Sequence, residues 1–410
     1  MTKSKILFVA PSSYPIFGAE ANVNAKMLKL LSEAGCVIDL VARTPRMVYE
    51  LYPLSENDFF FSKLNSINMV QVNTDMDVKT VIRHLRTYLK TGYVYKGADW
   101  SVAAIKVCEK LINETKYDFI YTYDYPSELV GLYLAKKYGI KWVSVFNDPY
   151  IWERYPAPYG RGPKTKMSAN REKLIADIGN HLFRAVFPSD RLRDYMLGYM
   201  TNLRKEISVV SPHLRNDELF VINDKKLNET LSIIHSGILS PVRNPETFLR
   251  GLRLFLNKCP DARIKFDFLG RVEWDNFDNT MKELNLFNYI ELIPPVVYDK
   301  SLEIVQGYDI CMLLEASCEE GIFLPSKVID YMQNGKPIFA ISPAVGVIND
   351  MYKNREVDYF ADVTSSEQIA TVIENFYSDF EKGEIGVKSK NTEKYSNKTI
   401  LDIHLNQILN

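Results

Sequence analysis

Apolar and polar positions follow one another along this chain in a pattern that predicts strands and helices in regular succession. Residues 5–11 form a continuous apolar run, as in a strand buried on both faces, and a turn-rich loop containing Gly18 follows. From Glu20 the apolar residues recur at helical spacing, and residues 36–42 form a second apolar run. A strand, a helix and a strand within about 40 residues predict a right-handed βαβ unit, and hence a parallel sheet.

The same alternation continues to the end of the chain. In the first half, strands are expected at residues 118–123, 141–147, 184–188 and 207–211, and helices at residues 78–90, 100–115, 127–138, 173–183 and 191–199. In the second half, strands are expected at residues 231–238, 263–269, 289–292, 310–314 and 337–341, and helices at residues 246–257, 280–286, 327–333, 366–377 and 399–409. The succession predicts an α/β protein with two tandem Rossmann-like doubly wound domains.

The polar, irregular stretch 213–230 is interpreted as a linker between these domains. It separates an N-terminal domain of residues 1–212 from a C-terminal domain of residues 231–390, and a tail helix within residues 391–410 is expected to pack back on the N-terminal domain. Ligands of open α/β sheets bind outside the carboxyl ends of the strands, so a cleft between the domains is the expected site.

The composition is that of an ordinary globular protein, with 410 residues, 46% hydrophobic and 25% charged. It excludes a disordered chain and a disulfide scaffold, and no apolar stretch approaches the roughly 20 residues of a membrane-spanning helix. The five cysteines are widely spread without a CxxC pair, and none of the five histidines has metal-ligand spacing. We therefore expect a cytoplasmic protein without disulfides, zinc or a resident cofactor.

A net charge of −1 conceals an asymmetry between the two halves. Residues 1–212 hold 29 Lys+Arg against 21 Asp+Glu, whereas residues 213–410 hold 21 against 30. This difference fits either drift between two solvated surfaces or a basic first half that meets an anionic acceptor or the inner face of an anionic membrane.

The segment from Glu319 to residue 337 carries the strongest chemical signal. A loop there opens a helix at about Ser326, so backbone N–H groups and the helix dipole favour an anion such as a diphosphate. Lys327 in the first turn adds positive charge, and Asp330 one turn later has the acceptors that a ribose diol needs. An ordinary capped helix with solvated charges is the alternative interpretation.

This segment resembles the nucleotide-sugar motif of the two-domain, retaining glycosyltransferases of family four and their relatives, which have the GT-B fold. The shared pattern is Pro-x-Lys-x-x-Glu/Asp-Tyr followed by Gly-Lys/Arg-Pro, which here comprises Pro325, Lys327, Asp330, Tyr331, Gly335, Lys336 and Pro337. The resemblance implies that Asp330 binds the donor ribose and that Glu320 contacts the donor sugar, with Glu319 as a rival. Ile322 is a departure, because many members have a second glutamate eight residues before the acid on the helix.

Three further segments match the same family in order. Gly18 lies in the loop after the first strand, Gly237 and Arg243 open the second domain, and Gly270-Arg271 follow the next strand. The resemblance implies that Arg243 clamps the donor diphosphate, a role that suits a bidentate guanidinium. The predicted donor-binding residues are therefore Gly18, Gly237, Arg243, Gly270, Arg271, Ile322, Phe323, Leu324, Ser326, Lys327 and Asp330, and the predicted catalytic residues are Glu320, Arg243 and Lys327.

The acceptor is expected on the N-terminal domain. Asp124 and Asp148 follow predicted strands, so either lies where a cleft residue belongs or acts as a local cap. Tyr150 begins an aromatic and basic segment, residues 150–173, that is interpreted either as a sugar- or phosphate-binding loop or as a mobile solvated one.

These features together predict a glycosyltransferase that moves a sugar from a nucleotide-diphosphate donor to a hydroxyl of a glycan or lipid-linked glycan. Charge stabilisation of the leaving diphosphate by Lys327 and Arg243 would drive the transfer without a metal, and retention of anomeric configuration is implied by the resemblance alone. A role in bacterial surface polysaccharide synthesis, peripheral to the inner membrane and without nucleic acid, is the expected setting. A nucleotide-sugar epimerase and a non-catalytic sugar-nucleotide- or glycan-binding subunit remain alternatives.

Overall fold

The computed structural model describes residues 4–44, 58–72, 78–95, 97–123, 125–219, 227–386 and 391–410. These residues form two compact units. The first comprises Met1–Tyr155, Arg161–Leu214 and Asn397–Asn410, and the second comprises Pro156–Gly160 and Arg215–Ser396. The predicted α/β class with two Rossmann-like domains is confirmed, because each unit has its own parallel sheet.

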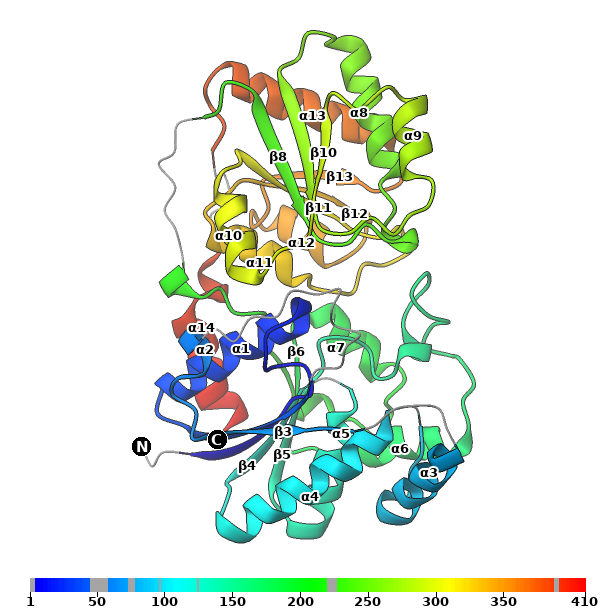
Figure 1. Cartoon of the computed structure of the whole chain (residues 1–410), viewed down its shortest axis with the longest axis vertical. Helices are drawn as coiled ribbons and strands as arrows, with labels where there is room; N and C mark the ends of the chain where they lie inside the picture. The colour runs from blue at the N-terminus through cyan, green and yellow to red at the C-terminus, as the bar shows by residue number, and fades with distance from the viewer. Residues whose placement is uncertain are drawn as a thin grey trace. The chain divides into compact units, whose positions relative to one another are not determined.

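The first unit contains a seven-stranded sheet in the order β3-β2-β1-β4-β5-β6-β7, in which all neighbours are parallel. Its strands are β1 (Lys5–Val9), β2 (Val37–Arg43), β3 (Ser66–Val70), β4 (Phe119–Tyr123), β5 (Lys141–Val145), β6 (Arg184–Phe187) and β7 (Ser208–Val210). Its helices are α1 (Gly18–Glu33), α2 (Asp58–Phe61), α3 (Val78–Thr91), α4 (Ala98–Glu114), α5 (Ser127–Tyr138), α6 (Ala169–His181), α7 (Asp190–Leu197) and α14 (Asn397–Ile403). The chain reverses its direction of winding between β1 and β4, so helices cover both faces of the sheet (Figure 1).

The second unit contains a six-stranded parallel sheet in the order β10-β9-β8-β11-β12-β13. Its strands are β8 (Leu231–Ser236), β9 (Ile264–Leu269), β10 (Ile290–Ile293), β11 (Ile310–Leu314), β12 (Ile338–Ser342) and β13 (Tyr359–Asp362). Its helices are α8 (Glu246–Lys258), α9 (Phe277–Glu283), α10 (Tyr298–Gln306), α11 (Ser326–Gln333), α12 (Val347–Lys353) and α13 (Ser366–Glu381). Helices α8, α9 and α13 lie on one face of the sheet, and α10, α11 and α12 lie on the other (Figure 1).

Apolar strands buried on both faces form the core of each unit, as their continuous apolar runs predict. Every residue of β4, β11 and β12 is buried. His235 of β8 is a core residue with 1% exposure, and its Nδ1 lies 3.1 Å from the Met312 carbonyl oxygen. Burial lowers the pKa of His235 well below its ordinary value, so this residue is neutral at physiological pH.

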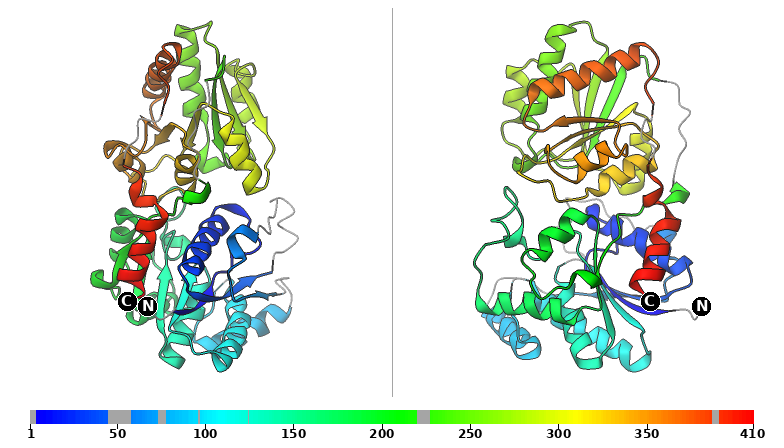
Figure 2. Two further views of the ribbon diagram at one scale, coloured as in Figure 1. Left: turned by 90° about the vertical axis from the view of Figure 1, so that its left-hand side faces the viewer. Right: turned by 180° about the vertical axis from the view of Figure 1, so that it is seen from behind.

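The C-terminal segment is part of the first unit, where Figure 2 shows it in red. Its buried residue His404 anchors it: Nδ1 lies 2.7 Å from the Tyr121 hydroxyl, and Nε2 lies 3.2 Å from the Ser211 hydroxyl. Arg184 adds a hydrogen bond from Nε to the Gln407 carbonyl oxygen at 2.8 Å. The tail therefore completes the core of the first unit.

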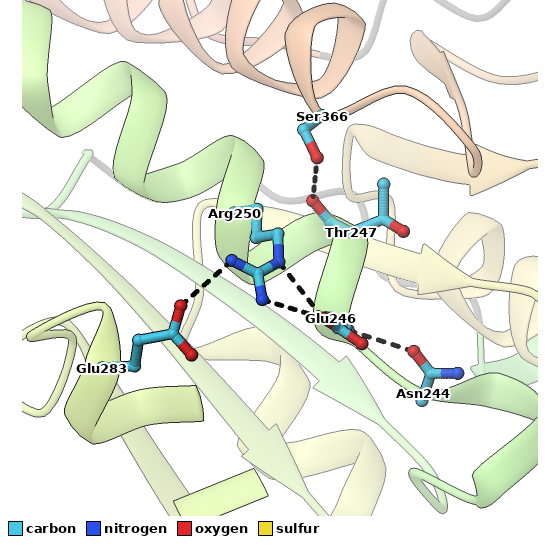
Figure 3. A network of polar contacts seen from close by, with 6 residues as sticks. All are labelled: Asn244, Glu246, Thr247, Arg250, Glu283 and Ser366. Atoms are coloured by element: carbon cyan, nitrogen blue, oxygen red, sulfur yellow. Dashed lines mark hydrogen bonds and ion pairs between the residues drawn. The ribbon is translucent and has the colours of Figure 1, made fainter. Parts of the chain in front are cut away.

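A polar network holds the start of α8 in the second unit (Figure 3). Arg250 donates to Glu246 at 2.9 and 3.1 Å and to Glu283 at 3.3 Å. The Ser366 hydroxyl donates to the Thr247 carbonyl oxygen at 3.1 Å, which ties α13 to α8. These bonds fix the backbone that immediately follows Arg243.

Candidate functional site

The second unit changes its direction of winding between β8 and β11, and several of the predicted donor residues lie near the carboxyl ends of these strands. Gly237 follows β8, and Glu315 follows β11. Helix α11 is fixed beside both strand ends by Tyr331. Its hydroxyl accepts a hydrogen bond from the Ser236 N–H at 2.9 Å and donates one to the Met312 carbonyl oxygen at 3.2 Å.

Lys327 lies against a stretch of backbone that has no side chain. A Cβ atom at position 237 would overlap the Lys327 ammonium group, and Gly237 has a φ of +146°, which favours glycine. Gly270 has a φ of +144°, and a Cβ atom there would overlap the Gly237 carbonyl. The structure therefore brings Gly237, Gly270 and Lys327 together, and it shows why both backbone positions require glycine.

Arg243 is held from two sides. Its backbone N–H donates to the Ser240 hydroxyl at 3.3 Å, which caps a short 3₁₀ turn. Its guanidinium Nε donates to the Tyr159 hydroxyl at 3.2 Å and lies over that ring, 5.6 Å from the centroid. Its Nη2 is 3.8 Å from Glu315 Oε2. A ring and a carboxylate thus orient the guanidinium.

The electrostatics around Lys327 favour an anion. Burial of the ammonium, together with the charge of Arg243, lowers the pKa of Lys327 to about 8, and Glu315 and Asp330 act in the opposite direction. Helix α11 has no capping side chain at its N-terminus and no acid in its first turn. Two cations and an uncompensated helix N-terminus provide what a diphosphate requires.

Asp330 lies one turn after Lys327 on α11. Its Oδ1 accepts a hydrogen bond from the Tyr298 hydroxyl at 2.8 Å, at the first residue of α10. This bond orients the carboxylate, and burial with the charge of Asp330 raises the pKa of Tyr298. Ribose binding by Asp330 remains a prediction.

Some residues of the loop before α11 pack in the core, and others lie at the surface. Ile322 and Leu324 are buried, at 1% and 5% exposure, so the position at which the resemblance implied a glutamate is an apolar core position in this chain. The Phe323 ring contacts the Tyr159 ring edge-on at a centroid distance of 5.3 Å. Glu319 is exposed and Glu320 is partly buried, and their roles remain predictions.

Arg271, predicted to reach the nucleotide, forms an ion pair with Glu273 at 3.1 Å. Ser326, also predicted to bind the donor, is the first residue of α11. Gly18 is the first residue of α1, with a φ of +71°. Donor binding by these three residues remains a prediction.

The first unit contains a cavity of about 170 Å³ at the carboxyl end of β5. Two predicted acceptor residues, Asp148 and Tyr150, line it, whereas Asp124 lies outside the described residues. Glu20 also lines this cavity. Desolvation of the carboxyl group, together with the charge of Asp148, raises the pKa of Glu20 to about 7, although Glu20 as a residue is exposed.

Sequence reasoning did not name as site residues several that the structure places in these two sites, among them Glu20, Glu128, Glu315, Tyr159 and Tyr298. Glu315 is the first polar residue after the apolar run of β11, a signal that could have identified it as a residue at a strand end. Glu128 follows β4 by a few residues in the same way. Tyr159 lies in the aromatic and basic segment 150–173, which the sequence indicated as a whole without naming this residue. Tyr298 lies far along the chain from Asp330, and no local pattern indicates it.

Across the residues that the structure describes, no group of three or more His, Cys, Asp or Glu side chains is placed to hold a metal ion. None of the helices there combines the length and the apolar character that crossing a bilayer requires.

Comparison with solved structures identifies proteins of the same fold. The structure of Anabaena HepE in complex with UDP and glucose is 13% identical, with 97% of each chain covered and a TM-score of 0.66. Sucrose-phosphate synthase from Thermosynechococcus elongatus is 13% identical, covering 99% of this chain and 98% of its own, with a TM-score of 0.70. A glycosyltransferase from Rickettsia africae is 14% identical, covering 99% of this chain and 97% of its own, with a TM-score of 0.67.

The chain has the two-domain fold of these proteins. The GT-B fold implied by the sequence resemblance is therefore confirmed. No family model and no curated protein matches the sequence, so the likeness is one of fold.

The charge of Arg243 is expected to control the ionisation of Lys327. Labelling of Lys327 by acetic anhydride, followed by peptide mass spectrometry across pH, should show a midpoint near pH 8. In Arg243→Gln the midpoint should rise, because a neighbouring positive charge is lost. Arg250→Gln is the matched control, since Arg250 contacts Glu246 and Glu283 instead. A wild-type midpoint near 10.4, the ordinary lysine value, would contradict this electrostatic description.

Proposed function

We propose that this protein is a glycosyltransferase that transfers a sugar from a nucleotide-diphosphate sugar to a hydroxyl of a glycan or lipid-linked glycan. The observation that carries the proposal is the convergence of Lys327 and Arg243 at the uncapped N-terminus of α11. The presence of UDP and glucose in the Anabaena HepE structure supports it, because that protein shares the fold.

The proposed chemistry follows from where negative charge develops. As the bond from the anomeric carbon to the diphosphate breaks, charge accumulates on the leaving phosphate oxygen. Lys327 and Arg243 stabilise that charge most when it is fully developed, which lowers the barrier to transfer. Glu315 and Tyr159 hold Arg243 in position, and Asp330 orients the nucleotide through its ribose.

Two finer features belong to the same proposal. We propose that transfer is metal-independent, because two side-chain cations and a helix N-terminus can neutralise the diphosphate. We also propose that it retains the anomeric configuration, for which the resemblance of the Pro325–Pro337 motif to retaining glycosyltransferases is the support. The setting proposed is bacterial surface polysaccharide or glycoconjugate synthesis.

The test combines donor binding with product formation by the full chain. Among UDP-, GDP- and dTDP-sugars, one nucleotide class should raise the melting temperature and support transfer to a glycan acceptor, with or without EDTA. Lys327→Met should lower the transfer rate about 100- to 1,000-fold, as removal of one transition-state donor does in other enzymes. Lys300→Met is the matched control, because Lys300 is exposed and pairs with Glu303.

Other outcomes would replace the proposal. Interconversion of two nucleotide sugars without transfer would identify an epimerase. Donor or glycan binding with neither transfer nor hydrolysis would identify a binding subunit. Full transfer activity in Lys327→Met would contradict the assigned role of the cation.

We further propose that the enzyme works at an anionic membrane surface, and helix α3 supports this setting. Its side chains Val81, Ile82, Leu85, Tyr88 and Leu89 recur on one helical face and are exposed, Val81 and Leu89 at 72% and 74%. The helix contains no Asp or Glu, and Arg86 is exposed beside this face. An apolar face with a basic border is typical of helices that lie in the interface of anionic bilayers.

Flotation with lipid vesicles tests this setting. The protein should float with vesicles containing phosphatidylglycerol and less with pure phosphatidylcholine, and Leu85→Gln/Leu89→Gln should remain unbound. Leu254→Gln, which removes an exposed leucine of α8, is the control. Failure of the wild type to float would contradict the proposal, and a dimer lost in the double variant would instead show that α3 contacts a second copy.

A further inference from the structure

The cavity of the first unit is lined by acceptors and aromatic rings. Three carboxyl side chains, Glu20, Glu128 and Asp148, line it together with aromatic residues that include Tyr150 and Trp152. The lining contains no Lys, Arg or His. Its volume of about 170 Å³ is well below the roughly 300–1,000 Å³ of sites for drug-sized ligands, so it has room for one small ring.

Glu128 presents a buried polar atom without a partner to this cavity. The residue lies in the first turn of α5 and is 3% exposed. Within the described residues, its Oε2 has no hydrogen-bond partner. Buried polar atoms are nearly always satisfied, because leaving one unpaired destabilises the fold. An unpaired carboxyl oxygen beside a cavity therefore indicates a polar ligand.

The chemistry of the wall selects the ligand. No cation lines the cavity to neutralise a phosphate or carboxylate, whereas hydroxyl or ammonium groups would find carboxyl acceptors. Trp152, 57% exposed, offers an aromatic face of the kind that packs on the C–H face of a sugar ring. The combination suits a hydroxyl-bearing ring and disfavours an anionic one.

We propose that this cavity binds the terminal sugar of the acceptor, that this sugar carries no phosphate or carboxylate, and that Glu128 hydrogen-bonds one of its hydroxyls. That the bound sugar belongs to an acceptor rests on the proposed function. The inference makes Glu128 a residue that determines acceptor specificity.

The ionisation of Glu128 agrees with this role. Burial, with the charge of Glu20 adding to it, raises the pKa of Glu128 to about 8. At pH 7 the carboxyl group is therefore mostly neutral, and it can donate as well as accept a hydrogen bond. A glutamine should consequently replace it with little loss, whereas leucine should not.

The experiment measures binding of free sugars to the full chain, in the absence of any donor, by intrinsic fluorescence and isothermal titration. The panel is glucose, galactose, N-acetylglucosamine and glucosamine against glucuronate and glucose 6-phosphate. We expect one or more of the first four to bind and neither anionic sugar to bind. Glu128→Leu should weaken binding about tenfold or more, and Glu128→Gln should not, as loss of a buried hydrogen bond predicts.

Two further variants serve as a second test of the cavity and as a control. Trp152→Ala changes an exposed side chain and should weaken binding even if Glu128→Leu fails to fold. Glu114→Gln, at an exposed acid of α4, should bind as the wild type does. Three results would each overturn the inference. They are anionic sugars that bind as tightly as the neutral ones, unchanged affinity in both Trp152→Ala and a folded Glu128→Leu, and no binding by any sugar.

The outcome is separable from that of the proposed function. If sugars bind as described but no donor supports transfer, the cavity assignment stands and the glycosyltransferase proposal fails. If transfer occurs but acceptor preference is the same in Glu128→Leu as in the wild type, the enzyme proposal stands and the cavity assignment fails.

Discussion

Lys327 places its ammonium group at the end of strand β8, where the absence of a Cβ atom at Gly237 leaves room for it. The same backbone position touches Gly270 at the end of β9, so two strand ends and one helix approach one another more closely than side chains would allow. This close approach determines where the Lys327 ammonium group lies. The hydrogen bonds of the Tyr331 hydroxyl hold α11 beside these strands, and Asp330 precedes Tyr331 on the same helix.

The positive charges of Arg243 and Lys327 are only partly neutralised by their surroundings. Arg243 and Lys327 repel one another, and the depressed pKa of Lys327 shows that the surroundings disfavour its charged form. Glu315 compensates in part, through an ion pair with Arg243 at 3.8 Å. A bound diphosphate would satisfy both cations and the helix N-terminus together. The leaving group of a nucleotide sugar is such an anion, which is why the proposed activity follows from electrostatics as well as from the shared fold.

The sequence predicted the fold well where apolar runs were long. Helix α5 was predicted at its observed bounds, and β11 likewise, because buried strands and capped helices leave a strong local pattern. Strand β13 and helices α10 and α12 were not predicted, since these short elements mix polar and apolar residues. Their stability comes from packing on the sheet, which no local window records.

Prediction of the residues of the two sites from the sequence was limited in the same way. The motif at residues 325–337 indicated Lys327 and Asp330 because a helix start has a recognisable pattern. Glu315 and Glu128 become visible only when strand ends from distant parts of the chain meet. Position 322 looks like a missing acid in the sequence, and in the structure Ile322 is a core residue with 1% exposure. Burial, which the sequence does not give, distinguishes these cases.

If Lys327 binds the donor diphosphate as a cation, binding should be accompanied by proton uptake. At pH 8 about half of Lys327 is neutral, so a diphosphate that raises its pKa should draw in up to about half a proton per site. Calorimetry of nucleoside diphosphate binding in buffers of different ionisation enthalpy measures this uptake. We expect uptake at pH 8 that disappears in Lys327→Met. Binding without proton uptake, or equal uptake in that variant, would contradict it.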